Sequence, residues 1–570
     1  MELVELKNWW LNNQNVWFNS TESDDIEITN KFEHLIDIQF NTTQLIDNID
    51  QGIGYIILHD QIVRHIKRVK NYPDEFILNK LDNIISFVEQ LYLKYKNHLS
   101  GYDFCFVLLP LRHTNLFEKQ VYVIQETWNK ITCFVHDTSN PNEQKLLLIY
   151  KNYLKASYER TSSGKVYLTS NQIGWKIQEK IEEFVNKFKD IFDPTCHNYK
   201  SNLNYLTLDN LNPIIKACEK LKHTNIKNII LSISGGIDSI CLSYIYMILG
   251  IEFVMVHINY SNRGEICEKE KEMLKYWAGY IGIELYIRDI EEISRPKCME
   301  WDMRSLYESY THDVRYQSYI DVLCIKGWNL TNSGIMLGHN HDDCIENILT
   351  NIISKTKYEN LYGMEFKTNI KFKFYDICFI RPILTITKSQ IYDFAHQYNI
   401  PYLSDSTPKW SQRGQIRDII RPNLINWNKS SINGLDELSK IMKSSMECVD
   451  MLVDNWIEKM YLELNDKDIV SQIKKLLTNT ITINSLRFLK INIDELKPNK
   501  IFWSRLLAKL KFNINSRILD DLLNKIKIIK KQFLIIQPKQ KTQIKFTQKN
   551  IIYYWKTLDN YLIFSFVKMI

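Results

Sequence analysis

The 570-residue sequence predicts a multidomain protein with an all-α N-terminal part, a central α/β part built on a doubly wound parallel sheet, and a C-terminal part of helices and a small α+β region. In residues 1–160, apolar side chains recur at three- and four-residue spacing, as in amphipathic helices. Residues 205–425 alternate short apolar runs with helical patterns, and residues 426–570 are first helical and then rich in lysine. A chain of this length exceeds one core, so we expect several domains.

Composition narrows the class of protein. Hydrophobic residues make up 45% of the chain and charged residues 24%, which is ordinary for a globular protein. The net charge of +6 is compatible with nucleic-acid binding without being diagnostic of it. None of the 11 cysteines forms a CxxC pair, which argues against a zinc ribbon and fits free thiols in a reducing compartment. The charged start lacks a signal-peptide core and no apolar run approaches the roughly 18 residues of a membrane span, so we expect a cytoplasmic protein without membrane contact.

The N-terminal part carries a set of aromatic and charged positions in a recognisable order. These are Trp9-Trp10, Trp17-Phe18, Leu58-His-Asp-Gln61 with Arg64, and Phe106–His113 with Gln120. Together they resemble a helical DUF924-type domain with TPR-like helices, and the sequence departs from that pattern at His65 and Thr114-Asn115. The resemblance implies an all-α domain over residues 1–160. A helical scaffold without a site is the open alternative, no chemistry is assigned there, and a protein partner is one expectation for these helices.

Residues 161–204 predict a helix followed by a linker, because residues 190–204 show no clear period. The domain at 205–425 then contains five apolar runs of the length of buried strands. These strand candidates are Ile229–Ile233, Phe253–Ile258, Leu285–Arg288, Ile335–Gly338 and Phe379–Arg381. Helical patterns separate them, as the crossovers of a parallel sheet require.

The most informative stretch is Ser234-Gly-Gly-Ile-Asp-Ser239, between the first of these strands and a predicted helix. Such a turn can receive a phosphate, because glycines let the backbone approach closely and the free N–H groups of a helix start favour negative charge. The hydroxyls of Ser234 and Ser239 add donors, and Asp238 can orient an amine or help to hold Mg²⁺. The lysine of a Walker A loop is missing. An ordinary glycine-containing turn is the alternative.

This hexapeptide resembles the signature of the PP-loop ATP pyrophosphatases, which cleave ATP between its α and β phosphates and adenylate a substrate. The resemblance implies a sheet of the adenine-nucleotide α-hydrolase type and the use of ATP with Mg²⁺. It also implies that one loop holds the pyrophosphate, with Asp238 at the metal. The loop residues are Ser234, Gly235, Gly236, Ile237, Asp238 and Ser239.

Polar residues follow the other predicted strands. His257 ends the second strand, where doubly wound sheets bind ligands, although a lone histidine there is more often structural. Asp343 and Glu346 share one helical face. Beside an anionic nucleotide two carboxylates require a cation between them. Alternatively, they form the solvated acidic start of a helix. Arg413 and Arg417 share a face that can clamp a phosphate or a carboxylate, or that simply faces solvent.

In this order, the motifs resemble those of the tRNA(Ile)-lysidine synthases over about residues 225–425. The matching segments are Ser234–Ser239, His257–Arg263, Glu308 with Arg315-Tyr316, His339–Asn347, Arg381–Lys388, Asp405–Thr407 and Arg413–Pro422. Residues 491–545 resemble the small C-terminal substrate-binding region of the same family. The sequence departs from the pattern at Tyr260, His312, Asn340 and Gly414.

The resemblance implies a ligase that adenylates the wobble cytidine of tRNA(Ile) and then displaces AMP with the ε-amine of L-lysine. Asp343 and Glu346 would meet the ammonium of lysine, and Arg417 or Arg413 its carboxylate or a phosphate. The implied catalytic residues are Asp238, Asp343, Glu346 and Arg417. The implied nucleotide-binding residues beyond the loop are His257 and His339. The implied substrate-binding residues are Arg315, Arg381, Lys388 and Arg413. Residues 426–570 would bind tRNA.

Three other functions stay open at this point. A PP-loop tRNA thiolase, acting on another base, normally needs CxxC ligands that this sequence lacks. An amide synthetase would need an ammonia source such as a glutaminase cysteine, and the helical N-terminal part shows none. A PP-loop that survives as an inactive RNA-binding scaffold is the non-enzymatic alternative.

Overall fold

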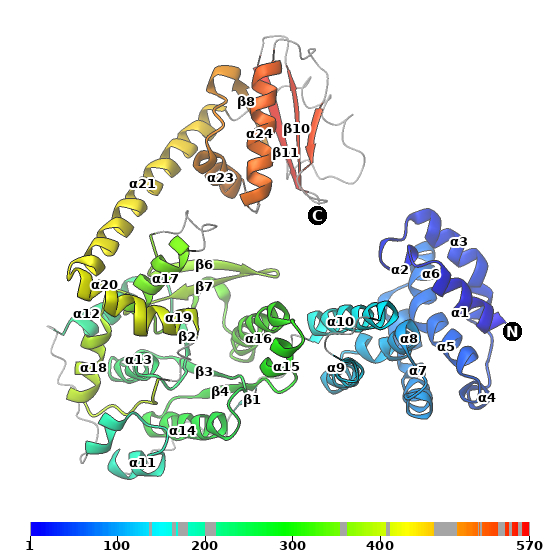
Figure 1. Ribbon diagram of the computed structural model, residues 1–570, viewed down its shortest axis with the longest axis horizontal. Helices are drawn as coiled ribbons and strands as arrows, with labels where there is room; N and C mark the ends of the chain where they lie inside the picture. Colours follow the sequence, from blue (N-terminus) through cyan, green and yellow to red (C-terminus); the bar gives the residue numbers. More distant parts are fainter. Residues whose placement is uncertain are drawn as a thin grey trace. The chain divides into compact units, whose positions relative to one another are not determined.

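Figure 1 shows the helices and strands of the computed structural model. Its contacts divide the chain into two compact units. The first contains Met1–Gly338 and Lys367–Asp405, and the second contains His339–Phe366 and Ser406–Ile570. The structure describes residues 2–135, 140–161, 167–168, 181–199, 212–353, 362–405, 411–460, 487–510, 512, 516–533, 542–545, 550–556 and 561–568. Within these ranges no helix has both the length and the apolar character to cross a membrane.

The first unit begins with an all-α domain, as predicted. Its helices are α1 (Glu2–Asn12), α2 (Val16–Asn19), α3 (Glu22–Phe32), α4 (Thr42–Ile46), α5 (Ile49–Ile57), α6 (Val63–Lys70), α7 (Asp74–Tyr95), α8 (Gly101–His113), α9 (Phe117–Thr132) and α10 (Pro141–Thr161). A π-helical turn, Leu58–Ile62, joins α5 to α6. Side chains fix several starts: Thr21 and Asp24 form a capping box at α3, and Asn48 caps α5. The apolar faces of the helices meet around buried rings such as Trp10 and Phe104.

Helix α5 packs closely on α1 at Gly54. A Cβ atom added to Gly54 would overlap the backbone carbonyl oxygen of Leu3, which cannot move aside as a flexible side chain can. We therefore expect Gly54→Ala to destabilise the helical domain by about 2 kcal/mol. Hydrogen–deuterium exchange of the whole chain should then be faster in α1 and α5. As a control, Gly434→Ala in α21 (Ser431–Met460) meets nothing within 4 Å and should leave exchange there unchanged or slower. Equal exchange of α5 in both variants would contradict the close contact.

A seven-stranded sheet forms the centre of the first unit, in the order β1-β4-β3-β2-β5-β7-β6. Its strands are β1 (Tyr167–Leu168), β2 (Asn228–Ser232), β3 (Val254–Asn259), β4 (Leu285–Asp289), β5 (Ser333–Met336), β6 (Lys367–Phe372) and β7 (Tyr375–Ile380). Strands β2 to β5 and β7 are parallel, whereas the edge strands β1 and β6 are antiparallel to their neighbours. The chain continues from β2 to β3 on one side and returns to β5 on the other, so the strand order reverses beside β2. Doubly wound sheets bind ligands at such a reversal.

Helices cover both faces of this sheet. They are α11 (Ile181–Lys187), α12 (Pro213–Glu219), α13 (Ile237–Ile248), α14 (Glu265–Ile281), α15 (Arg295–Glu300), α16 (Arg304–Ile325) and α18 (Lys388–Gln397). Ile230 and Val256 join the core that contains Tyr319 of α16. Their neighbours Leu231 and Met255 are also buried and, because side chains alternate along a strand, they point to the opposite face. The central sheet is thus doubly wound, as predicted.

The predicted strands differ most from the observed ones at β5 and β7. β5 covers 333–336 instead of 335–338, and β7 begins at Tyr375 instead of Phe379. The early start of β7 comes from its hairpin with β6, whose turn contains Lys373 at a φ of 52°. β1 and β6 were not predicted: β1 has only two residues, and β6 alternates exposed with partly buried side chains and so lacks a continuous apolar run.

The predicted linker at 190–204 is wrong for its first ten residues. Ile191, Phe192 and Cys196 are buried, and Phe192 forms a β-bridge with Leu403. The N–H of Asp193 also donates to the carbonyl oxygen of Tyr402 at 3.1 Å. A 3-10 turn, Pro194–Asn198, explains why the stretch showed no helical or strand period although it packs. Residues 200–204 lie outside the described residues.

The helical domain is joined to the sheet domain by buried polar contacts. The hydroxyl of Tyr158 in α10 donates to the carbonyl oxygen of Glu292 at 2.8 Å and accepts from Trp128 Nε1 at 2.9 Å. The Glu292 carboxylate in turn accepts from Tyr310 of α16 at 2.7 Å and pairs with buried Arg288. The hydrogen bond from Tyr158 to Glu292 crosses the boundary between buried groups, so the two domains share a packed interface.

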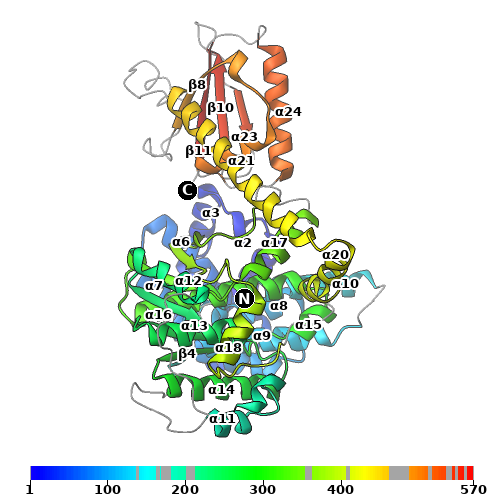
Figure 2. The same cartoon turned by 90° about the vertical axis from the view of Figure 1, so that its left-hand side faces the viewer.

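The second unit consists of helices and a small antiparallel sheet. Its elements are α17 (His341–Ile353), α19 (Gln412–Gln415), a π-helical turn (Ile416–Ile420), α20 (Arg421–Trp427), α21, β8 (Arg487–Asn492), α23 (Lys500–Lys509), α24 (Ser516–Gln532), β9 (Thr542–Lys545), β10 (Asn550–Lys556) and β11 (Tyr561–Lys568). The strand order is β8-β11-β10-β9. Helix α21 continues from α20 to this C-terminal part (Figure 2), where Val453 joins a core around Trp503 and Leu506.

Candidate nucleotide and substrate sites

The glycine-rich turn follows β2 at the reversal of the strand order, as the sequence predicts. Gly235 has a φ of 84°, in the left-handed region, and a Cβ atom there would overlap the side chain of Leu403. The N–H of Leu403 donates to the carbonyl oxygen of Gly235 at 3.0 Å, so the turn is held from outside. The end of β5 lies against it as well, since a Cβ on Gly338 would be 3.1 Å from Cβ of Asp238.

Two serine hydroxyls organise the inside of the turn. The Ser239 hydroxyl donates to the carbonyl oxygen of Gly236 at 3.0 Å and accepts the N–H of Ser234 at 3.2 Å. The Ser234 hydroxyl accepts the N–H of Gly236 at 3.4 Å. Gly236 is the N-cap of α13 and brings no side chain to its first N–H groups. The turn therefore combines a close backbone, two hydroxyls and a helix start, which suits a phosphate.

Asp238 and Lys388 form an ion pair beside this turn. Lys388 Nζ lies 2.6 Å from Asp238 Oδ2, and both side chains are about one-quarter exposed. Lys388 is the first residue of α18, which starts with a capping box between Thr387 and Gln390. The structure thus supplies a cation at the turn from a segment 150 residues away in the sequence.

His257 supports the turn from the neighbouring strand β3. It is buried, and its Nδ1–H donates to the carbonyl oxygen of Ile233 at 3.0 Å. Burial lowers the pKa of His257, so the ring is neutral around pH 7 and its Nε2 is an acceptor. The predicted nucleotide contact of His257 stays a prediction; the hydrogen bond that the structure describes fixes the residue before the turn.

Arg315 and Arg381 lie in the same unit but have other neighbours. Arg315 hydrogen-bonds Tyr260, the residue that departs from the family pattern. Burial raises the pKa of Tyr260, and the positive charge of Arg315 reduces this rise without cancelling it. Arg381 follows β7, is buried, and donates from Nη1 to the Thr368 hydroxyl at 2.9 Å. Their predicted contact with substrate stays a prediction.

The second unit holds a compact cluster of opposite charges. Asp343 and Glu346 of α17 lie on one helical face, and both are buried. Arg413 Nε donates to Glu346 Oε2 at 2.7 Å and its Nη2 contacts Asp343. Arg417 Nε donates to Glu346 Oε1 at 2.8 Å, and its Nη2 is 3.7 Å from Asp343 Oδ1. The two predicted pairs thus bind each other, and the cluster carries two charges of each sign.

Further contacts fix the start of α17. The N–H of Asn340 donates to Asp343 Oδ2 at 3.0 Å and the N–H of Asp343 donates to Asn340 Oδ1 at 3.1 Å, a reciprocal cap. Arg421 pairs with Asp342 at 2.9 Å. His339 is the first residue of this unit. Sequence spacing gave no sign of the Asn340 cap or the Arg421–Asp342 pair, because neither belongs to a periodic pattern.

The donor groups limit how a metal ion would be held. In the part of the chain with described coordinates, no group of three or more His, Cys, Asp or Glu side chains converges. A Mg²⁺ ion at Asp238 would therefore take most of its oxygen ligands from phosphates and water, which is usual for Mg²⁺ in phosphate chemistry.

Comparison with known proteins assigns two of the domains. Residues 210–427 match the family model of the PP-loop domain, and residues 6–161 match that of DUF924, bacterial proteins of unknown function. A tRNA(Ile)-lysidine synthase of Clostridioides difficile is 27% identical over 256 residues, covering 42% of this chain and 52% of that protein. One of Chlamydia muridarum is 29% identical over 210 residues, covering 35% and 58%. One of Clostridium acetobutylicum is 25% identical over 272 residues, covering 46% and 55%. The chain spans about half the length of these curated relatives.

Proposed function

We propose that this chain, with its PP-loop domain, is an ATP-dependent tRNA-modifying ligase that joins L-lysine to the wobble cytidine of tRNA(Ile) and so forms lysidine, which changes decoding to AUA. The observation that carries the proposal is the serine- and glycine-lined turn at the reversal of the sheet, with Lys388 beside it. The similarity to proteins named tRNA(Ile)-lysidine synthase supports the choice of substrate.

The turn would serve the first step, in which O2 of the cytidine attacks the α phosphorus of ATP and pyrophosphate leaves. The N–H groups at the start of α13 and the hydroxyls of Ser234 and Ser239 would hold the departing pyrophosphate. Lys388 would add a positive charge where negative charge grows. When bound, Mg²⁺ would neutralise phosphate charge, and Asp238 is the residue that would hold it.

The charge cluster of the second unit would serve lysine. Free lysine carries an α-carboxylate and two ammonium groups; one ammonium and the carboxylate can exchange into a cluster of alternating charges, and the second positive charge disappears once the ε-ammonium gives up its proton. The ammonium would replace a guanidinium at Asp343 or Glu346, while the carboxylate would meet Arg413 or Arg417. The attacking ε-amine must lose a proton first, and a carboxylate of this cluster is the base available for it.

The direct test measures AMP release by the purified chain with ATP, Mg²⁺, lysine and a tRNA(Ile) transcript. Release should require both lysine and tRNA, and the product nucleoside should have the mass of lysidine. A transcript with uridine in place of the wobble cytidine is the matched control and should give no product. AMP release that ignores lysine and the wobble base would overturn the proposal, and tRNA binding without any AMP release would favour an inactive RNA-binding scaffold.

The C-terminal region offers a separate test of tRNA binding. Lys525, Lys527 and Lys531 are exposed on α24, whose apolar side is buried in the core of this region. If they contact phosphates, replacing all three by Gln should lower the slope of log K against log salt concentration by about 2, since each neutralised phosphate contributes roughly 0.7–0.9. Filter binding at several salt concentrations measures this slope. An unchanged slope would place the tRNA contacts elsewhere.

A further inference from the structure

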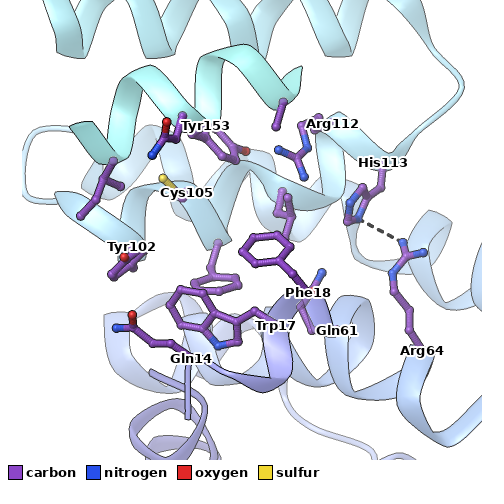
Figure 3. A pocket seen from close by; sticks show the side chains of 15 residues that line it. Gln14, Trp17, Phe18, Gln61, Arg64, Tyr102, Cys105, Arg112, His113 and Tyr153 are labelled. Carbon is purple, nitrogen blue, oxygen red and sulfur yellow. Dashed lines mark hydrogen bonds between the residues drawn. The ribbon is translucent and has the colours of Figure 1, made fainter. Parts of the chain in front are cut away.

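A cavity of about 560 Å³ lies in the helical N-terminal domain (Figure 3). Residues of α2, α8 and α10 form most of its wall, which is mainly aromatic and aliphatic. Prominent among them are Trp17, Phe18, Tyr102, Phe106, Leu109 and Ile149. A concave apolar cavity of this size, with a few polar groups at one place, is the usual form of a small-molecule site.

Positive charge gathers at one end of this cavity. Arg64 of α6 and the consecutive residues Arg112 and His113 of α8 line that end (Figure 3). Asp60 of the π-helical turn is buried there and accepts hydrogen bonds from Arg64 Nη2 at 2.9 Å and His113 Nδ1 at 2.8 Å. Burial opposes the ionisation of Asp60, but His113 and Arg64 outweigh it and lower its pKa. The charge of Asp60 is thus paired with Arg64, and Arg112 brings a second guanidinium to the same end.

Arg112 brings the charge that Asp60 does not neutralise. Its guanidinium lies 5.0 Å from the centroid of the Tyr153 ring, and its buried Nε has no hydrogen-bond acceptor among the residues that the structure describes. The Tyr153 hydroxyl is likewise buried without a partner within those residues, in a side chain that is only 8% exposed. A buried donor without an acceptor is energetically unfavourable. An anionic group at this end of the cavity would satisfy both donors.

A third arginine adds to the local positive charge. Burial, followed by the like charges of Arg64 and Arg112, lowers the pKa of Arg160 at the end of α10. The positions at this end also include Asp60, Gln61, Arg64 and His113, which belong to the sequence pattern that the ligase chemistry does not use. A π-helical turn at Leu58–Ile62 places Asp60 among them, and such turns are frequent at functional sites.

We propose that this cavity binds a small organic anion: an apolar, preferably aromatic body packs among Trp17, Tyr102 and Phe106, and a carboxylate or phosphate head is held by Arg112 and Arg64. The apolar wall and the cationic end of the cavity would recognise different parts of the ligand. Ring contacts with the apolar wall would supply most of the buried area, and charge-assisted hydrogen bonds at the cationic end would orient the ligand. A neutral molecule of the same shape lacks the second part and binds more weakly.

The test uses the fluorescent dye 8-anilino-1-naphthalenesulfonate, an aromatic anion, with the whole chain. Wild-type protein should bind one more dye molecule than Ala156→Phe, in which the larger side chain fills the cavity without changing any charge. Arg112→Gln should weaken binding at this site about tenfold, because one charge-assisted interaction is lost. Lys94→Gln, the same charge change on the exposed face of α7, should bind dye like wild type.

Competing ligands separate the possible head groups. 1-Naphthoate and 1-naphthyl phosphate should displace the dye, and the better competitor identifies a carboxylate or a phosphate site, whereas neutral 1-naphthol should need at least tenfold more. Equal dye binding by wild type and Arg112→Gln, or displacement by 1-naphthol as good as by the anions, would overturn the proposal. These two outcomes decide the matter even if Ala156→Phe does not fold.

Discussion

Asp238→Asn should lower the rate of AMP formation about a hundredfold or more while the chain stays folded. The change keeps the size of the side chain but removes the charge that lies 2.6 Å from Lys388 Nζ in the glycine-rich turn. A neutral amide oxygen binds a cation more weakly than a carboxylate does, and loss of one group that stabilises charge in a transition state typically costs a factor of about 10²–10³. Single-turnover AMP formation from ATP in the presence of tRNA measures the effect. Thermal unfolding should change little, because the pair is partly exposed to water.

A matched control is available on the helix that carries Lys388. Asp393→Asn removes the same charge from an exposed position of α18 and should retain the wild-type rate. If Asp238→Asn and Asp393→Asn are equally active, the turn is not where ATP reacts. If both lose activity together with structure, as seen by circular dichroism, α18 has a structural role that the ion pair does not explain.

Glu346→Gln should slow the lysine-dependent step while leaving the adenylation of tRNA nearly unchanged. Glu346 is buried and accepts hydrogen bonds from both Arg413 and Arg417, so the amide leaves two guanidinium groups facing one remaining carboxylate, Asp343. We expect the lysine-dependent step to fall about a hundredfold, because an approaching ammonium then meets excess positive charge. Adenylation of tRNA, followed by ATP–pyrophosphate exchange, should stay within a few-fold of wild type. The chain should lose about 2 kcal/mol of stability, since the arginines are partly exposed and can be solvated.

Glu437→Gln serves as the comparison, because Glu437 in α21 pairs only with exposed Lys440 in the described structure. It should affect neither step. A Glu346→Gln enzyme that forms lysidine at the normal rate would remove lysine binding from this cluster. A Glu346→Gln variant that loses ATP–pyrophosphate exchange and ligation to the same extent would indicate a structural role for the cluster instead.

The sequence was sufficient for features that depend on neighbouring residues. An apolar run, two glycines and a second apolar run predicted the turn, and the spacing of three between Asp343 and Glu346 predicted their shared face. It could not show that this face meets Arg413, because 70 residues separate Asp343 from Arg413 and no local pattern encodes the pairing. The same holds for Lys388 and Asp238, whose contact depends on where α18 docks.

The missed edge strand β6 and the wrongly predicted linker before Tyr199 have a related cause. Strand prediction relies on burial, and β6 alternates exposed with partly buried residues. The stretch before Tyr199 packs through an irregular 3-10 turn, so its buried Phe192 and Cys196 show no period. The cavity of the N-terminal domain was not predicted either, because its wall comes from helices far apart in the chain.

The hydrogen bonds of Tyr158 have a consequence for any shortened form of this chain. If residues up to the end of α10 were removed, Tyr310 and the Arg288–Glu292 pair in the remaining fragment would become exposed, and an aromatic surface would face water. Such a fragment would tend to aggregate through this surface, however intact its glycine-rich turn. The sheet domain and the helical domain are therefore best kept together in expression and purification, and a fragment that fails to work would not by itself show that the helices take part in chemistry.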